Sequence, residues 1–481
     1  MKIYLFLLLS LSFLQAQTYE EYLKEQESAF VSFKEERDKE FSDFLKKDWK
    51  EYRESKGLKV YEVKKPRTLP KLDIKKTAPD KKPHEKLKLI VIKKEKLTRK
   101  QKVYKQIIIK PSSNQLKTLY FTYFGVDLQV NYDKSILFNI NSKISKKEIS
   151  KSWDKLANSK YEEIIKDINT ISDKLKLNDW AKYLLVKQIS NSIYNHKNEE
   201  KLFLWFALLK MDYDTHIAYK GNKLIILLPV KGEFYNTTYY RLGKKKYYAI
   251  NYYAKGSVGQ VSTYKNSYEG ATKSLNFYLE DIPRFAQTIV KKSLKFKIGK
   301  DVKNIHLKYN KNLTMFFNSY PQVSYINYFS ASDSALLKDS IKEEFEPLIV
   351  GKTQEEALDI ILNFVQNAFK YKVDAEQFNI EKVMFASETI FYPYSDCEDR
   401  AILFSYMVKL LLNIDVIGLK YPNHMATAVN VDEKLKGDYV TYKNRSYLVA
   451  DPTYINAKVG VSMYKFKKGS SYSIVATGAE K

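Results

Sequence analysis

The sequence predicts an α+β fold, because helical and strand-like stretches occur in separate runs along the chain. Residues 145–211 and 395–412 carry apolar side chains at helical spacing, whereas residues 293–330 alternate as strands do. Gly221-Asn222 stands between the two apolar runs of residues 217–230, which is typical of a β-hairpin. We therefore expect helices packed on antiparallel sheets.

Composition narrows the class of protein. The 481 residues include 82 Lys plus Arg and 56 Asp plus Glu, which gives a formal net charge of +26. Because 44% of the residues are hydrophobic and 14% aromatic, a wholly disordered polycation is excluded. The length suggests about three domains. One cysteine excludes a disulfide framework and a thiolate metal cluster, and five scattered histidines leave little for a zinc site, so we expect no metal.

Residues 1–17 have the pattern of a secretory signal peptide: Lys2, an apolar run Ile3–Leu14, and cleavage near Ala16 or Gln17. The apolar run is shorter than the ~20 residues that span a bilayer. No later stretch is long and apolar enough, and no cysteine follows the run to carry a lipid anchor. We expect an exported protein, periplasmic or secreted, without a transmembrane segment and attached at most at a surface.

The N-terminal part divides into a helix and a basic linker. Residues 18–56 lack Pro and Gly and carry an apolar stripe, which predicts one long amphipathic helix. Its stripe could dock within the chain or form a coiled coil. Residues 57–115 are predicted as a linker, and the stretch 57–110 holds 19 Lys or Arg against five acids. It would concentrate at an anionic surface, or serve as a solvated tether. Nucleic acid is the weakest partner, since no motif for it accompanies the charge.

Downstream of the linker we expect an α+β domain over residues 116–270, a β-rich segment over 271–345, and a second α+β domain over 346–481. In the last of these, residues 353–369 are predicted as a helix. His216 and His306 lie in strand-like stretches without sequence partners, so we expect them to be structural.

The one thiol lies at a predicted helix start. Ser395 and Glu398 have the spacing of a capping box, which places Cys397 at the second helical position. Free backbone N–H groups and the helix dipole favour a thiolate there. The carboxylates of Asp396, Glu398 and Asp399 oppose a further negative charge, so a cationic partner is needed.

Two further residues complete a candidate catalytic triad. His424 opens an apolar strand, and Asp451 ends another one just before Pro452. A thiolate, an imidazole that shares its proton and a carboxylate that fixes the tautomer are the groups of cysteine-based acyl transfer. If the last three strands formed a plain meander, Asp451 would lie at the opposite end of the sheet from His424. The triad therefore requires the middle segment to be a protruding arm or part of one long hairpin.

These blocks resemble the transglutaminase-like superfamily of bacterial cysteine enzymes. The resemblance rests on Asp396–Arg400, His424–Val429 and Asp451–Tyr454, and it covers residues 352–467, a little under a quarter of the chain. It implies a papain- or transglutaminase-like domain in which a helix packs on an antiparallel sheet.

The resemblance also implies roles for individual residues. Cys397 would be the nucleophile, His424 the base, Asp451 the residue that orients His424, and Gln366 a weaker candidate for the oxyanion donor. Members of the family include proteases, amidases and transamidases. The implied chemistry is acyl transfer from a protein or peptide substrate through a Cys thioester, to water or to an amine, without a cofactor.

A shift of 201 positions aligns the C-terminal region with residues 195–264 without a gap. Leu403-Phe404 falls on Leu202-Phe203, Asp415 on Asp214, Asn423 on Asn222, and Val459-Gly460 on Val258-Gly259. Cys397, His424 and Asp451 then fall on His196, Lys223 and Ile250, so the earlier copy would be catalytically dead. A generic likeness of two helix-plus-hairpin segments is the alternative.

Two functions follow from these observations. The first is an exported cysteine hydrolase or transamidase that uses Cys397. The second is a non-catalytic scaffold or binding protein of the cell envelope, attached through its helix and linker, whose transglutaminase-like folds bind a ligand. Alkylation of Cys397 well below the usual thiol pKa of ~8.5 would favour the enzyme.

Overall fold

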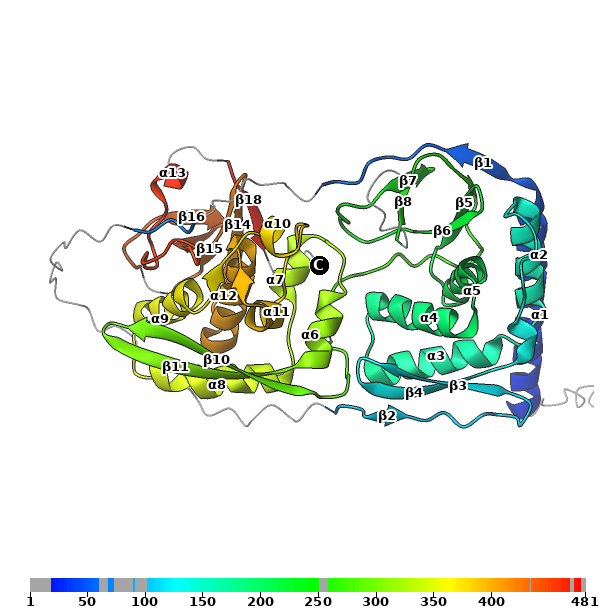
Figure 1. Ribbon diagram of the computed structural model, residues 1–481, viewed down its shortest axis with the longest axis horizontal. Helices are drawn as coiled ribbons and strands as arrows, with labels where there is room; N and C mark the ends of the chain where they lie inside the picture. The colour runs from blue at the N-terminus through cyan, green and yellow to red at the C-terminus, as the bar shows by residue number, and fades with distance from the viewer. Residues whose placement is uncertain are drawn as a thin grey trace, which may run out of the picture.

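The computed structural model describes residues 19–59, 68–72, 90, 102–250, 258–279, 281–432, 434–467 and 471–476. The predicted signal peptide and most of the basic stretch 57–110 lie outside these residues. The described chain forms two lobes side by side, and each combines helices with an antiparallel sheet (Figure 1). The predicted α+β class is confirmed.

The first lobe begins with a hairpin, continues through helices and ends in a sheet. The hairpin pairs β3 (Lys117–Tyr123) with β4 (Val126–Tyr132), and β2 (Gln106–Ile107) runs parallel to β4. The 3₁₀ turn η1 (Lys134–Ile136) and the helices follow: α2 (Lys146–Ala157), α3 (Glu162–Leu175), α4 (Asp179–Ile193) and α5 (Lys197–Lys210).

The sheet of the first lobe has the strand order β1-β9-β5-β6-β8-β7. Its strands are β1 (Trp49–Tyr52), β5 (His216–Lys220), β6 (Lys223–Leu228), β7 (Tyr239–Leu242), β8 (Lys245–Ala249) and β9 (Val261–Tyr264). The predicted hairpin over residues 217–230 is confirmed as β5 and β6, and Gly221 has the positive φ of 56° that its turn requires.

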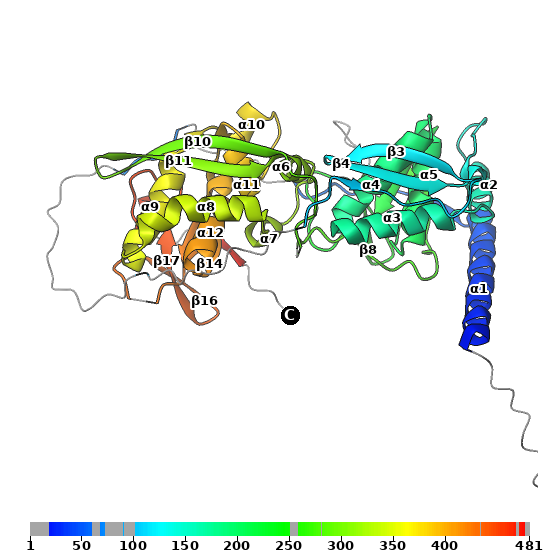
Figure 2. The same cartoon turned by 90° about the horizontal axis from the view of Figure 1, so that it is seen from below.

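The N-terminal helix α1 (Tyr19–Lys47) ends earlier than predicted, because the chain turns at Asp48 into β1, which pairs with β9. The prediction of one helix over residues 18–56 was therefore wrong at its C-terminal end. The buried ring of Phe41 contacts Trp153 of α2 with centroids 4.7 Å apart. This part of the apolar stripe docks within the chain, and Figure 2 shows the rest of α1 projecting from the lobe.

The described pieces of the basic segment contact both lobes. The Leu58 carbonyl accepts from the Asn236 N–H over 2.8 Å in the first lobe, whereas Lys71 bridges to Ile455 in the second. The Ile90 N–H donates to the Lys352 carbonyl over 2.8 Å, also in the second lobe, before the chain returns to the first lobe in β2. The segment therefore ties the lobes together at these points.

The second lobe repeats the sequence of hairpin, helices and sheet. Its hairpin is β10 (Ile289–Ile298) and β11 (Asp301–Asn310). The helices are α6 (Lys311–Asn318), α7 (Tyr325–Ser330), α8 (Ala335–Ile349), α9 (Gln354–Asn367), α10 (Asp374–Gln377), α11 (Ala386–Phe391), α12 (Cys397–Leu412) and α13 (Tyr464–Lys467). The short strands β12 (Lys370–Tyr371) and β13 (Tyr394–Ser395) pair in parallel.

The sheet of the second lobe has the order β16-β17-β15-β14-β18. Its strands are β14 (Val416–Tyr421), β15 (His424–Val429), β16 (Tyr439–Tyr442), β17 (Arg445–Ala450) and β18 (Ser473–Ala476). This order matches β7-β8-β6-β5-β9 of the first lobe strand for strand, and in both lobes a long helix, α5 or α12, precedes the sheet.

A buried contact repeats with the strand order. Tyr247 on β8 donates its hydroxyl to Asp214 over 2.8 Å, and Tyr447 on β17 donates to Asp415 over 2.8 Å. Asp214 precedes β5 by two residues, and Asp415 precedes the equivalent strand β14 by one. The shared strand order and contact favour the duplication over a generic likeness.

The β-rich segment predicted over residues 271–345 is wrong in its second half. Strand β11 ends at Asn310, and helices α6, α7 and α8 follow. In α6, Leu313, Phe316 and Phe317 are spaced by three and four positions, so they bury one face of a helix although aromatic residues are also typical of strands. Phe296 of β10 packs 5.3 Å from Phe364 of α9, so the hairpin belongs to the second lobe.

Aromatic side chains join the two lobes. Tyr320, after α6, contacts Phe277 of the first lobe and Phe385 of the second, with ring centroids 6.2 and 5.1 Å apart. The same apolar cluster extends to Cys397 and Met425. Of the helices in the described part of the chain, none combines the length and apolar character needed to cross a bilayer.

Candidate active site

Cys397 is the first residue of α12, one position earlier in the helix than predicted. Ser395 lies in β13, so the cap is Asp396, whose N–H donates to Asp399 Oδ2 over 3.1 Å. The predicted Ser395–Glu398 capping box was therefore wrong by one residue, because pairing with β12 holds Ser395 in a strand. The expected setting at the positive end of a helix is confirmed for Cys397.

A buried guanidinium supports the same turn. Arg400 is fully buried and donates to Ser395 Oγ over 3.1 Å, and to the carbonyls of Gln366 and Phe369 over 3.0 and 2.8 Å. Burial lowers the pKa of Arg400 to about 10, so the group stays cationic at neutral pH. A negative charge on Cys397 would raise the pKa of Arg400, so this fixed cation lies near the thiol. Arg400 was not among the predicted site residues.

His424 and Asp451 meet as predicted. His424 Nε2 lies 2.7 Å from Asp451 Oδ2, and both residues are buried. Burial alone would raise the pKa of Asp451, but the charge and hydrogen bond of His424, together with hydrogen bonds from Thr453, bring this pKa below its usual value. An ionised Asp451 that accepts from Nε2–H leaves Nδ1 as the basic nitrogen of the imidazole.

The strand order explains how Asp451 returns to His424. Strand β17 pairs directly with β15 in antiparallel register, with Ala450 opposite Thr427, and β16 lies on the outer side of β17. The end of β17 therefore meets the beginning of β15. The long-hairpin arrangement that the triad requires is the one observed.

Thr453 fixes the carboxylate of Asp451, and this role was not predicted from the sequence. Its N–H and hydroxyl donate to Asp451 Oδ1 over 3.0 and 2.8 Å, and its oxygen lies 3.3 Å from His424 Nε2. Because the threonine holds one carboxylate oxygen, the other oxygen is left to the imidazole. The only signal for this role in the sequence is the proximity of Thr453 to Asp451.

Gln366 has a different task from the one predicted. Its side-chain nitrogen lies 3.1, 2.9 and 3.0 Å from the carbonyl oxygens of Asp451, Tyr454 and Ala457. Because these three acceptors engage the amide, it is not directed at an oxyanion. Gln366 instead stabilises the loop that carries the aspartate.

Cys397 and His424 lie at the same end of the sheet. Lys420 is paired opposite Met425, next to His424 in β15. Burial lowers the pKa of Lys420, and the charge of Glu398 opposes this shift, so Glu398 lies near the end of β14. The helix start is therefore held near the first residue of β15, against which α12 packs.

The thiol donates a hydrogen bond to Glu398 Oε2 over 3.0 Å. An acceptor carboxylate favours the protonated thiol, as the acidic neighbours predicted. In this arrangement the proton would have to leave Cys397 before attack. The buried Arg400 and the helix dipole oppose the effect of Glu398.

Aromatic rings enclose the imidazole. Phe466 of α13 stacks on His424 with ring centroids 5.1 Å apart and an interplanar angle of 5°. Tyr421 stacks in turn on Phe466 at 4.2 Å. These rings contribute to the burial of the site, where Cys397 is 3% and His424 5% exposed.

Three buried carboxylates near the thiol could contact a cation. Oxygens of Asp374, Asp396 and Glu398 lie within 4.8 Å of one another. Asp374 already accepts from the Lys382 N–H over 2.8 Å, and Glu398 accepts from the thiol. Oxygen ligands of this kind suit hard cations such as Ca²⁺ or Mg²⁺.

The first lobe carries other side chains at the equivalent positions. His196 caps α5, Lys223 begins β6, and Ile250 follows β8. His216 has partners that the sequence did not predict, since its Nδ1 lies 3.1 Å from the Tyr264 carbonyl and its Nε2 3.7 Å from Asp214. His306 contacts Ser293 Oγ at 3.0 Å on the hairpin of the second lobe.

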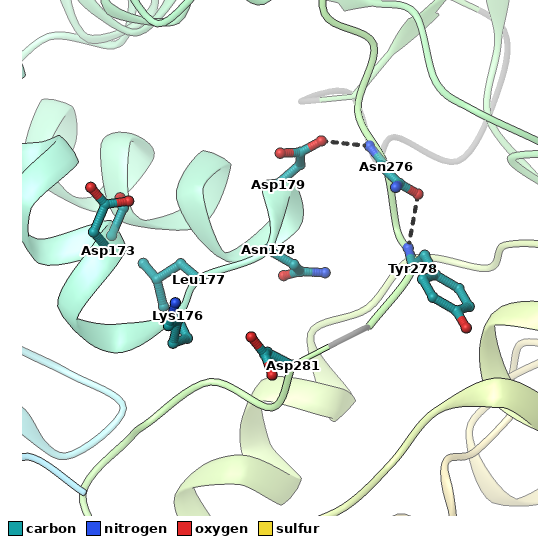
Figure 3. Close-up of a pocket in the computed structure, with 9 residues that line it drawn as sticks. Asp173, Lys176, Leu177, Asn178, Asp179, Asn276, Tyr278 and Asp281 are labelled. Carbon is teal, nitrogen blue, oxygen red and sulfur yellow. Dashed lines mark hydrogen bonds between the residues drawn. The ribbon is translucent and has the colours of Figure 1, made fainter. Parts of the chain in front are cut away.

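A cavity of about 280 Å³ lies in the first lobe, apart from the triad (Figure 3). Asp173, Lys176, Asn178 and Asp281 surround it, and Asp179 accepts from the Asn276 N–H over 2.9 Å. Because this carboxylate already holds the backbone, it serves the local fold.

The chain matches no protein-family model, no curated protein and no solved structure. The resemblance to transglutaminase-like enzymes stays a prediction from the three sequence blocks.

Proposed function

We propose that this protein is a transglutaminase-like cysteine enzyme that cleaves or transfers peptide or amide acyl groups through a thioester on Cys397. The contact that carries the proposal is the 2.7 Å approach of His424 Nε2 to Asp451 Oδ2 at the end of the sheet that lies beside the helix start. A buried, ionised carboxylate on one imidazole nitrogen makes the other nitrogen a base.

The proposed reaction follows from these positions. His424 Nδ1 takes the thiol proton, and the Cys397 sulfur attacks the carbonyl carbon of the substrate. Backbone N–H groups at the start of α12 stabilise the oxyanion, and the protonated imidazole gives its proton to the leaving amine. Water or an acceptor amine then attacks the thioester, with His424 again taking the proton. Asp451 and Thr453 hold the imidazole throughout.

The helix start is consistent with an oxyanion site. The dipole of α12 is positive at its start, where the capping box of Asp396 and Asp399 engages the third N–H of the helix. Arg400, fixed by its three hydrogen bonds, adds a positive charge behind this turn. Developing negative charge on the sulfur and on the carbonyl oxygen is stabilised by the same groups.

Alkylation of Cys397 by iodoacetamide tests the proposal. The native protein should keep a larger fraction of its alkaline alkylation rate at pH 6 than a denatured control does, because the thiol of that control has a pKa of ~8.5. Asp451→Asn should remove this advantage, because the amide no longer fixes the imidazole. Asp415→Asn, which alters another carboxylate of the same lobe, is the matched control and should retain it. A native thiol that reacts only at alkaline pH would contradict the proposal.

The alternative is a non-catalytic scaffold of the cell envelope. The hydrogen bond from the thiol to Glu398 favours it, because that bond stabilises an unreactive thiol. The first lobe also carries the same strand order without the triad residues at the equivalent positions. Equal, slow alkylation of the native protein and of Asp451→Asn would support the scaffold.

The proposed location is outside the cytoplasm. The sequence of residues 1–17 supports export, and the charge of residues 57–110 supports attachment to an anionic envelope surface. Release of the bound protein by salt, but not by nuclease, would distinguish this surface from nucleic acid.

A further inference from the structure

We propose that helix α13 and strand β18, called here the strap, close the active site and must move before a substrate reaches Cys397. The inference rests on the proposed function and adds its regulation. The strap follows the loop of Asp451, crosses the aromatic face of His424 through Phe466, and ends as the edge strand beside β14.

The contact between the strap and the site is specific. Phe466 stacks on the imidazole with the two rings nearly parallel at 5°, and Tyr421 contacts both rings, with centroids 4.2 Å from Phe466 and 6.3 Å from His424. Tyr472, just before β18, lies 5.4 Å from Tyr421. Aromatic pairs at these separations attract one another, so the closed arrangement is favoured in the absence of substrate.

The closed arrangement leaves little access to the nucleophile. Cys397 is 3% exposed and His424 5% exposed. Attack requires a carbonyl carbon about 3–3.5 Å from the sulfur, with the substrate chain leading away from it. A peptide that approaches the sulfur from the side of His424 would meet the space that Phe466 takes.

Comparison of the lobes indicates that the strap occurs in the same lobe as the triad residues. Gly259 and Gly460 both have a positive φ and stand at equivalent positions. Gly259 lies two positions before β9, whereas Gly460 lies thirteen positions before the matching strand β18. The additional chain carries α13 and Phe466, and it is found in the lobe that has Cys397, His424 and Asp451.

The strap is held in a way that permits movement. Strand β18 pairs over four residues, on one side, with β14, and its residues are half-buried or exposed. Tyr464 of α13 is 82% exposed, so the outer face of the short helix packs on little else. Short edge elements with few buried groups open at low free-energy cost.

The rate of iodoacetamide alkylation of Cys397 at pH 8 tests the strap, measured by intact mass. Phe466→Ala removes both ring stacks and should raise the rate about tenfold, the size expected for two aromatic contacts. Tyr464→Ala, in the same helix but exposed, is the matched control and should alkylate at the native rate. Phe466→Leu keeps an apolar side chain in case the alanine variant unfolds, and should give an intermediate rate.

The outcomes separate the strap from the triad. Circular dichroism checks that each variant is folded. Equal alkylation rates for the native protein, Phe466→Ala and Phe466→Leu would contradict the proposal that the strap closes the site. Faster alkylation of the Phe466 variants supports it, even where Asp451→Asn leaves the pH profile unchanged and the proposed catalysis fails. Conversely, the native thiol could react rapidly at pH 6 while Phe466→Ala reacts no faster. That result would support the proposed triad and contradict the proposed closure by the strap.

Discussion

The two lobes share one strand order and carry different side chains at the equivalent strand ends. Sheets β7-β8-β6-β5-β9 and β16-β17-β15-β14-β18 match strand for strand, and each lobe repeats the contact of a tyrosine with the aspartate before the first strand. At the positions of His424 and Asp451 the first lobe has Lys223 and Ile250. The fold is set by packing that both lobes keep, whereas the site depends on a few side chains at strand ends.

The lobes also differ in what covers those strand ends. In the second lobe, α13 lies over His424, while the first lobe passes from Gly259 to β9 within two positions. Both arrangements are compatible with the shared strand order. The comparison therefore separates the features needed for folding from those proposed for catalysis.

The largest expected effect is on acyl transfer itself. Cys397→Ala should abolish formation of a covalent adduct with an activated ester or peptide substrate, because the nucleophile is lost. Its thermal unfolding should change little, since a small apolar side chain still fills the site. Lys223→Ala, at the matching position of His424 in the first lobe, is the control and should leave adduct formation intact. A full adduct on Cys397→Ala would mean that another residue reacts.

Gln366→Ala should cause a large loss of stability and a slower reaction. Removing the amide takes one donor from the carbonyls of Asp451, Tyr454 and Ala457. The carbonyls of Asp451 and Tyr454 keep a backbone donor, so we expect a cost of roughly 2 kcal/mol in the free energy of unfolding. Gln129→Ala is the matched control, because Gln129 donates to the Ile109 carbonyl over 2.8 Å in the first lobe. In urea unfolding, Gln129→Ala should cost less free energy than Gln366→Ala. The alkylation rate of Cys397 in Gln129→Ala should equal that of the native protein.

Asp333 gives the second lobe a pH dependence of stability. Burial raises the pKa of Asp333 from 3.8 to about 6, so between these values the folded state binds more protons than the unfolded one. Stability should therefore fall as the pH rises from about 4 to about 6. Asp333→Asn should flatten this part of the curve and gain roughly 2 kcal/mol at pH 7. Asp301→Asn, at an exposed hairpin tip, should leave the curve unchanged in denaturant titrations.

The smallest expected effects concern the hydrogen bond from a tyrosine to an aspartate that both lobes contain. Tyr247→Phe should cost about 2 kcal/mol and Tyr447→Phe about 1 kcal/mol in urea unfolding, because a hydrogen bond to a carboxylate is worth more when fully buried. Asp214 is 1% exposed, whereas Asp415 is half-buried. Equal, negligible costs would mean that the shared contact does not support the fold of either lobe.

Much of the fold and part of the site could be predicted from the sequence. The hairpin of β5 and β6, helix α9 and the pairing of His424 with Asp451 follow from local patterns: turn residues, helical spacing and strand-end positions. The strand order in the second lobe could be inferred because the triad requires Asp451 to return beside His424. In these elements, the local sequence propensity and the geometry that the triad requires predict the same arrangement.

The remaining features depend on contacts between distant residues. The start of α12 moved by one residue because β13 pairs with β12, which lies more than twenty residues earlier. Gln366 could be placed near the site but not given its role, since its acceptors belong to a loop 85 to 91 residues away. Phe466 carries no local signal at all, because its stacking on His424 is a tertiary contact.

The most direct test of the central claim is intact-mass analysis of the protein after incubation with an activated acyl ester at pH 7, followed by peptide mapping. The account predicts one acyl group, bound at Cys397 as a hydroxylamine-labile thioester, that is much reduced in His424→Ala. Absence of any adduct in the native protein and in Phe466→Ala, or the same adduct in Cys397→Ala, would contradict it.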